Sequence, residues 1–146
     1  VNSKKENTKY LPGYKLENNL IATNDISDIS SSDLIIYCVP SDSFRQVSFQ
    51  SSDFIKEKSY LVSAAKGVEQ EGFKLMSQIL KEEIKKEVSV GVLSGPNLAN
   101  EISEEQLTGT VIASNDEFLN NDFFNLPIFS KFVKYLISFL FIIIKI

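Results

Sequence analysis

The chain has no histidine, no tryptophan and a single cysteine, Cys38, among its 146 residues. Without histidine, a Ser-His-Asp triad and a histidine-based zinc site are both excluded, and we expect no metal site. One cysteine cannot form an intrachain disulfide, which is typical of a cytoplasmic protein. Because Cys38 lies within the apolar run at residues 34–39, we interpret it as a buried and unreactive thiol.

The sequence also lacks basic blocks and a long apolar span. Its net charge is −4, so we do not expect nucleic acid as a partner. The first nine residues are polar and have no apolar region like that of a signal peptide. The apolar stretch at residues 132–146 contains two lysines and is shorter than the roughly twenty residues that cross a bilayer. A membrane is therefore not the expected partner either.

Short apolar runs alternate with helical patterns along the first 114 residues. We expect strands over residues 19–23, 33–39, 60–64, 88–93 and 108–113, and helices over 24–29, from Ser41 or Asp42 onward, over 71–86 and from Pro96 toward Glu104. This alternation predicts parallel β-α units and hence an α/β fold around a parallel sheet.

Two of the expected strands end in residues suited to hold an anion. Lys66 and Gly67 follow residues 60–64, and Ser94-Gly95-Pro96-Asn97 follows residues 88–93. Ligands of parallel sheets bind outside the carboxyl ends of the strands. A lysine there can stabilise negative charge, and a helix start offers free N–H groups. The ordinary alternatives are a solvated loop lysine and a capped helix start with proline near its first position.

A third strand, residues 33–39, ends at Pro40, and the helix after it carries Phe44 and Arg45. Phe44 could stack on the flat ring of a ligand. From its physical chemistry alone, however, an apolar side chain here is expected to pack in the core between the helix and the sheet. Arg45 is expected to face solvent. No Gly-x-Gly-x-x-Gly occurs, so the usual pyrophosphate-binding turn of a dinucleotide fold is absent from this chain.

Five short motifs occur in order: Tyr10-Leu11-Pro12-Gly13, Asn19-Leu20-x-Ala22-Thr23, Val39-Pro40-Ser41-x-x-Phe44-Arg45, Ala65-Lys66-Gly67-Val68-Glu69 and Ser94-Gly95-Pro96-x-x-Ala99-x-Glu101. In order and approximate spacing they resemble bacterial NAD(P)-dependent glycerol-3-phosphate dehydrogenase over residues 7–114. The resemblance implies a Rossmann-type, doubly wound parallel sheet at residues 1–114, truncated at both ends. That family reduces dihydroxyacetone phosphate to sn-glycerol 3-phosphate for phospholipid synthesis in the cytoplasm. NAD or NADP is thus the implied cofactor, and a homodimer is implied for the full-length protein.

The resemblance also implies site residues. By motif, Lys66 contacts both cofactor and substrate, Gly95 and Asn97 contact the substrate phosphate, Ala99 contacts the cofactor and Phe44 lines the nucleotide pocket. Most of the family has Ser or Thr where this chain has Asn97, which keeps a hydrogen-bond donor on a longer side chain.

Two parts of the family's machinery are expected outside this sequence. They are the first strand with its glycine-rich turn, before Val1, and a helical domain with the general-acid lysine, after Ser114. We therefore expect no catalytic residue in this chain and no turnover from it alone. Residues 115–146 are interpreted as a divergent apolar tail, which a frameshift or a truncation would explain. Alternatives for residues 132–146 are an aggregation-prone β segment and the membrane-associating tail of a non-catalytic remnant.

Overall fold

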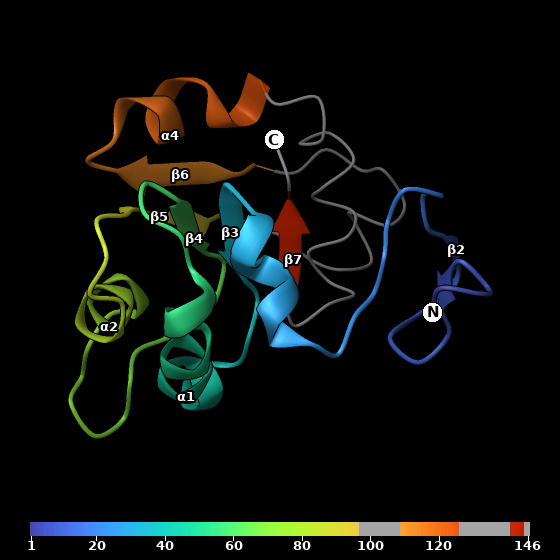
Figure 1. Cartoon of the computed structure of the whole chain (residues 1–146), viewed down its shortest axis with the longest axis horizontal. Coiled ribbons are helices and arrows are strands. Elements are labelled where there is room, and N and C mark those ends of the chain that lie inside the picture. The colour runs from blue at the N-terminus through green and yellow to red at the C-terminus, as the bar shows by residue number, and fades with distance from the viewer. Residues whose placement is uncertain (97–108, 126–140, 145–146) are drawn as a thin grey trace.

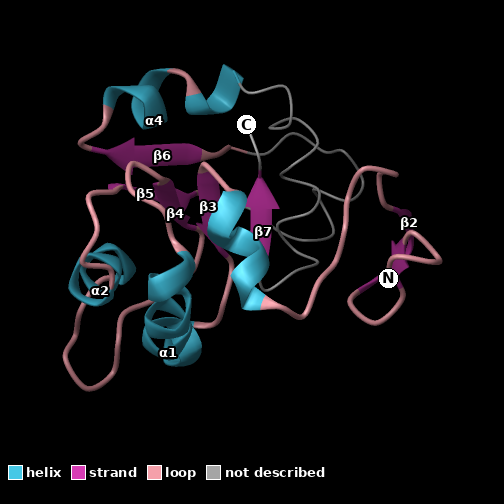
Figure 2. Ribbon diagram, viewed as in Figure 1, coloured by secondary structure: helices cyan, strands magenta, loops and turns pink. Residues whose placement is uncertain are grey.

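The structure, a computed structural model, describes residues 1–96, 109–125 and 141–144. In this part of the chain, helices lie on both faces of a five-stranded sheet with the order β6-β5-β4-β3-β7 (Figures 1 and 2). The strands are β3 (Leu34–Tyr37), β4 (Tyr60–Ser63), β5 (Ser89–Ser94), β6 (Val111–Ser114) and β7 (Phe141–Ile144). The central three are parallel, which confirms the predicted α/β fold with a parallel sheet.

Four predicted strands, at 33–39, 60–64, 88–93 and 108–113, appear within a few residues of their expected ends. The prediction of parallel β-α units is wrong for β6, which runs antiparallel to β5 with Val92 opposite Ala113. The apolar runs located these strands correctly because each is bounded by turn residues and packs against neighbours in the sheet.

Alternate residues of β3 face two separate cores. Ile35 and Tyr37 pack with η1 (Ile26–Ser31), α1 (Ser41–Ser51) and α2 (Met76–Glu83). Leu34 and Ile36 pack on the other face with α4 (Glu117–Asn121) and η3 (Phe123–Asn125). All four β3 side chains are fully buried, as expected of a strand covered on both faces.

The helix expected over residues 71–86 is shorter than predicted, because α2 begins only at Met76. A bridge between Val68 and Leu75 and a φ of +51° at Phe73 hold the preceding residues in a small hairpin instead. The predicted turn at residues 24–29 is the 3-10 helix η1, with the Asp25 side chain accepting from the Ser27 N–H (2.9 Å). A second 3-10 helix, η2 (Ser52–Phe54), follows α1.

The strand predicted at residues 19–23 is wrong. The Asn2 side chain accepts from the Ala22 N–H and donates to the Ala22 carbonyl, both at 2.7 Å. One amide side chain therefore meets the backbone groups that a strand neighbour would otherwise pair. The strands near the N-terminus are β1 (Glu6–Asn7) and β2 (Leu11–Lys15), which form a separate antiparallel pair.

Residues beyond the expected boundary at 114 contribute to the fold. Leu119 and Phe123 are buried at 0% and 1% exposure in the core that includes Leu34 and Ile36. Further along, β7 pairs antiparallel with β3, placing Ile144 opposite Leu34. Residues 141–144 therefore have the β conformation of one of the alternatives considered for this segment, and they pair within the sheet. Within the described ranges no helix is long and apolar enough to cross a membrane. The membrane alternative concerns residues 132–146, most of which lie outside those ranges.

Candidate functional site

The loops that follow β3, β4 and β5 meet at one edge of the sheet. Because these strands are parallel and in register, with Tyr37 opposite Ser63 and Ser63 opposite Val92, their carboxyl ends lie together. Lys66, three residues after β4, donates from Nζ to the Gly95 carbonyl oxygen at 3.0 Å. The structure thus brings together the two strand-end loops, at Lys66 and Gly95, that the sequence marks as suited to hold an anion.

Glycine permits the close approach of these loops. Gly67 has a φ of +125°, and a Cβ at this position would lie 3.1 Å from Ser41 Oγ. Gly95 has a φ of +152°. Few residues other than glycine adopt such values, so both positions depend on the missing side chain. Ser41 is also the first residue of α1, so the positive end of that helix lies at this edge.

The other predicted site residues are placed differently. Phe44 is fully buried, and its ring centroid lies 5.6 Å from that of Tyr37 in the core between α1 and the sheet. This burial favours the packing alternative, and its contact with the cofactor stays a prediction. Asn97 and Ala99 lie outside the described residues.

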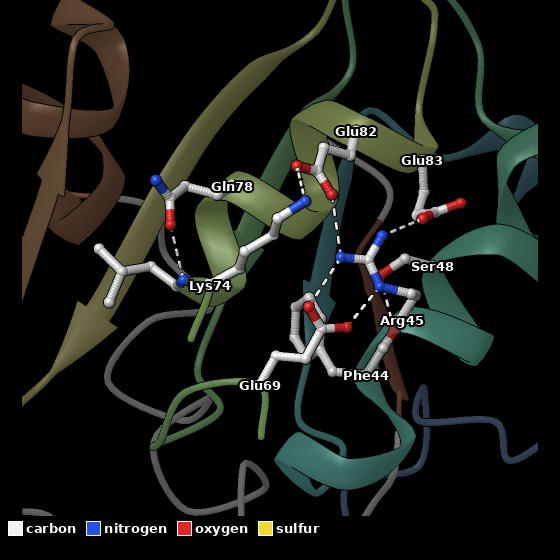
Figure 3. A network of polar contacts seen from close by, with 9 residues as sticks. Phe44, Arg45, Ser48, Glu69, Lys74, Gln78, Glu82 and Glu83 are labelled. Atoms are coloured by element: carbon white, nitrogen blue, oxygen red, sulfur yellow. Dashed lines mark hydrogen bonds and ion pairs between the residues drawn. The ribbon is translucent and has the colours of Figure 1, made fainter. Parts of the chain in front are cut away.

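Arg45 does not face solvent freely, which corrects the expectation from the sequence. It points from α1 into a group of carboxylates on the adjacent loop and on α2 (Figure 3). Its guanidinium contacts both oxygens of Glu69, with Nη2 donating to Oε2 at 2.9 Å. The same Nη2 donates to Glu82 Oε2 at 2.9 Å, and Nη1 donates to Glu83. Lys74 contacts the second oxygen of Glu82.

These contacts change the acidity of the carboxylates. The Arg45 guanidinium holds the pKa of Glu69 below its usual value, and Lys74 together with Arg45 does the same for the pKa of Glu82. Sequence reasoning missed this network, although Arg45 and Glu69 each belong to one of the five motifs. Their opposite charges could have suggested an ion pair between these two motif residues. Their spacing in the sequence, however, does not indicate that they are close in the fold.

Cys38 is partly buried beyond the end of β3. Burial raises the pKa of its thiol to about 12, so it remains protonated at neutral pH. This agrees with the predicted unreactive thiol, because the thiolate is the nucleophilic form. Cys38 therefore has no part in the candidate site.

The fold and the site define a class of protein. In this structure a lysine, two glycines and the start of a helix lie together at the carboxyl ends of parallel strands. This arrangement is typical of α/β domains that bind nucleotides at this edge of the sheet. Comparison with known families specifies which one. The family described as "NAD-dependent glycerol-3-phosphate dehydrogenase N-terminus" matches residues 1–120. The chain belongs to this family of oxidoreductases, and the resemblance seen in the sequence is confirmed.

Individual relatives agree with this assignment. Over 117 residues the chain is 49% identical to glycerol-3-phosphate dehydrogenase [NAD(P)+] of Saccharophagus degradans, covering 79% of this chain and 32% of the relative. It is 47% identical over 114 residues to the protein of the same name from Teredinibacter turnerae, covering 77% of this chain and 33% of the relative. The chain therefore spans about one third of the length of the curated relatives it matches.

A solved structure supports the fold. Glycerol-3-phosphate dehydrogenase from Coxiella burnetii superposes with a TM-score of 0.78 at 27% identity, covering 85% of this chain and 38% of the other. The predicted Rossmann-type fold in partial form is thereby confirmed. The expected boundary at residue 114 stays a prediction, since the matched family region runs to residue 120.

Proposed function

We propose that this chain supplies part of the site at which an NAD(P)-dependent glycerol-3-phosphate dehydrogenase reduces dihydroxyacetone phosphate to sn-glycerol 3-phosphate. The observation that carries the proposal is the 3.0 Å contact between Lys66 Nζ and the Gly95 carbonyl. It places an exposed ammonium group between the ends of β4 and β5. A phosphorylated ketone has two features that such a group attracts, a phosphate dianion and a carbonyl oxygen.

The site residues take the following roles in this proposal. Lys66 contacts both the substrate and the cofactor. Gly95 and Asn97 contact the substrate phosphate, and Ala99 contacts the cofactor. Phe44 is proposed to line the nucleotide pocket, and because its ring is fully buried in the core, this contact requires the ring to move out of that core.

NAD or NADP supplies the hydride when it is bound. The residues present fit such a cofactor at the strand-end edge, where Gly67 leaves the backbone without a side chain and so allows a ligand to approach closely. The chain contains no Gly-x-Gly-x-x-Gly, so these residues do not provide the usual pyrophosphate contact.

Lys66 acts by orientation and charge in this reaction. It holds the ketone in place for hydride transfer and stabilises the negative charge that forms on its oxygen. Protonation of the resulting alkoxide requires a general acid, and we assign none within this chain. We therefore propose that these 146 residues bind ligand without turnover.

The remaining features of the family are proposed for the whole protein. They are the use of its product in phospholipid synthesis, a cytoplasmic location and a homodimeric assembly. The similarity of the relatives supports these proposals, but they concern a protein about three times as long as the matched region.

Titration of the ¹⁵N-labelled chain with sn-glycerol 3-phosphate, followed by NMR, tests the proposal. We expect shifts at the Lys66, Gly67 and Gly95 amides. Lys66→Gln should weaken binding about fivefold or more, because hydrogen bonds from charged groups are among the stronger ones. Lys56→Gln is the matched control, because Lys56 pairs with Asp33 before β3, at the opposite edge of the sheet.

Three results would contradict the proposal. The first is a titration in which Lys66→Gln binds as tightly as the unchanged chain, and the second is one in which neither binds. The third concerns turnover: mixing the chain with NADH and dihydroxyacetone phosphate should leave the absorbance of NADH constant. Steady NADH oxidation that depends on the ketone would show that this chain carries its own general acid.

A further inference from the structure

The loop that carries Lys66 is long and needs to be held in place. Residues 64–75 join β4 to α2, whereas such connections usually have about two to six residues. The loop is tied at its start by the Ala64 N–H, which donates to the Tyr37 carbonyl at 2.9 Å. Farther along, the Glu69 N–H donates to the Lys74 carbonyl, also at 2.9 Å, and closes the small hairpin. Lys66 lies between these two points.

The first turns of α1 contact this loop at two positions. The Ser41 side chain packs against the backbone of Gly67, and Arg45 binds Glu69 through both carboxylate oxygens. Residues four apart on a helix share one face and are separated by a rise of about 6 Å. Two residues of extended chain span about 6.6 Å, so the spacing of Ser41 and Arg45 on the helix matches that of Gly67 and Glu69 on the loop.

Arg45 is itself held from the opposite side. Glu82 and Glu83 on α2 bind its two terminal nitrogens, so the guanidinium joins α1, α2 and the loop (Figure 3). The side chain of Arg45 is 34% exposed and that of Glu69 is 20% exposed, so water screens this pair only in part. A planar guanidinium that binds a carboxylate through two hydrogen bonds also fixes the direction of that carboxylate.

We propose that Arg45 is a positioning residue for Lys66: through Glu69 it holds the loop so that the Lys66 ammonium lies beside the Gly95 carbonyl. Arg45 itself does not touch the ligand. The inference rests on the proposed function, because it assumes that the Lys66 ammonium binds a phosphorylated substrate. It assigns a purpose to the Arg45–Glu69 pair beyond any contribution to stability.

Two glutamates that bind the same arginine make a matched test. Glu69→Gln removes the pairing on the loop side, whereas Glu83→Gln removes a pairing to α2 and leaves the loop contact intact. If the network were merely structural, both changes would lower the melting temperature and neither would act selectively on Lys66. Arg45→Gln and the distant Lys56→Gln complete the set.

The first readout needs no ligand. The ¹³C shift of the Gly95 carbonyl reports the hydrogen bond that it accepts from Lys66, and Lys66→Met, which has no side-chain donor, gives its value without that bond. We expect Arg45→Gln and Glu69→Gln to move the Gly95 shift toward that value, and Glu83→Gln and Lys56→Gln to leave it unchanged. If Arg45→Gln does not fold, Glu69→Gln alone decides the question.

The second readout is the affinity for sn-glycerol 3-phosphate. Arg45→Gln and Glu69→Gln should weaken it about threefold to fivefold, the upper part of the range found for exposed ion pairs, because this pair is partly buried. Wild-type affinity and an unchanged Gly95 shift in both variants would overturn the positioning role while leaving the proposed function intact. If the unchanged chain does not bind the ligand, the proposed function fails, and the Gly95 shift still decides whether Arg45 positions Lys66.

Discussion

The Gly67→Ala substitution tests the packing of the strand-end loop on α1. Gly67 has a φ of +125°, a conformation that residues with a Cβ rarely adopt. A side chain held there costs about 1–3 kcal/mol in backbone strain. The added methyl group would also lie 3.1 Å from Ser41 Oγ and 3.2 Å from Ser41 Cβ, closer than ordinary van der Waals contact. With a further term for overpacking, we expect a total loss of about 2–4 kcal/mol in the free energy of unfolding.

Two comparison variants separate the two causes. Gly13 has a φ of +86° and no atom within 4 Å of an added Cβ, so Gly13→Ala should cost only the strain, about 1 kcal/mol. Ser41→Gly removes both atoms that the new methyl group would meet. When Ser41 is already glycine, Gly67→Ala should lower the free energy of unfolding by about 1 kcal/mol less than it does in the unchanged chain. The effects of substitutions at two contacting residues are not additive.

Urea unfolding followed by far-ultraviolet circular dichroism measures these differences, and the chain has no tryptophan to report them by fluorescence. If Gly67→Ala unfolds at the same urea concentration as the unchanged chain, the close approach of the loop to α1 is refuted. If Ser41→Gly does not relieve the loss, the steric contact is refuted and only the backbone strain remains.

Two further predictions concern stability. Leu119 is fully buried and touches the position of Gly91 in β5, so Leu119→Ala should lower the free energy of urea unfolding by about 2–5 kcal/mol. The control is Ile21→Ala, at a side chain that is 78% exposed, which should change the free energy of unfolding by less than about 0.5 kcal/mol. If Leu119→Ala and Ile21→Ala change the free energy of unfolding equally, α4 is not packed on the sheet. The Arg45 guanidinium lowers the pKa of Glu69 in the folded chain. The pair therefore stabilises the fold fully at pH values above 4.5, the usual pKa of a glutamate, and this stabilisation is lost as the pH falls through the lowered pKa of the folded chain. The difference in melting temperature between the unchanged chain and Glu69→Gln should therefore narrow from neutral pH to about 3, and a constant difference would contradict this cause.

Much of the fold could be predicted because the signals are local. The apolar run that becomes β3 is bounded by Asp33 and Pro40, and proline cannot continue a strand ladder. An apolar run also predicted a strand at residues 19–23, and this prediction failed because the Asn2 side chain forms hydrogen bonds with the backbone N–H and carbonyl of Ala22. The predicted helix at 71–86 was too long because apolar spacing does not reveal the positive φ of Phe73. Each failure depends on a backbone conformation or a partner that periodicity does not encode.

The candidate site divides in the same way. Lys66 and Gly95 could be selected from the sequence because each follows a predicted strand, and parallel strands bring their ends to one edge. The place of Phe44 in the core and the binding of Arg45 by carboxylates could not. Both depend on which face of α1 meets the sheet and which meets the loop before α2.

The amino-acid sequence by itself determined the type of fold, the order of its central strands along the chain and the family, because motifs and side-chain periods are properties of neighbouring residues. Only the tertiary structure decided that Arg45 binds Glu69 across a gap of 24 residues, that β6 runs antiparallel and that β7 pairs with β3. Hydrogen bonds and ion pairs act over about 3 Å, so they form only between groups that the folded chain brings together.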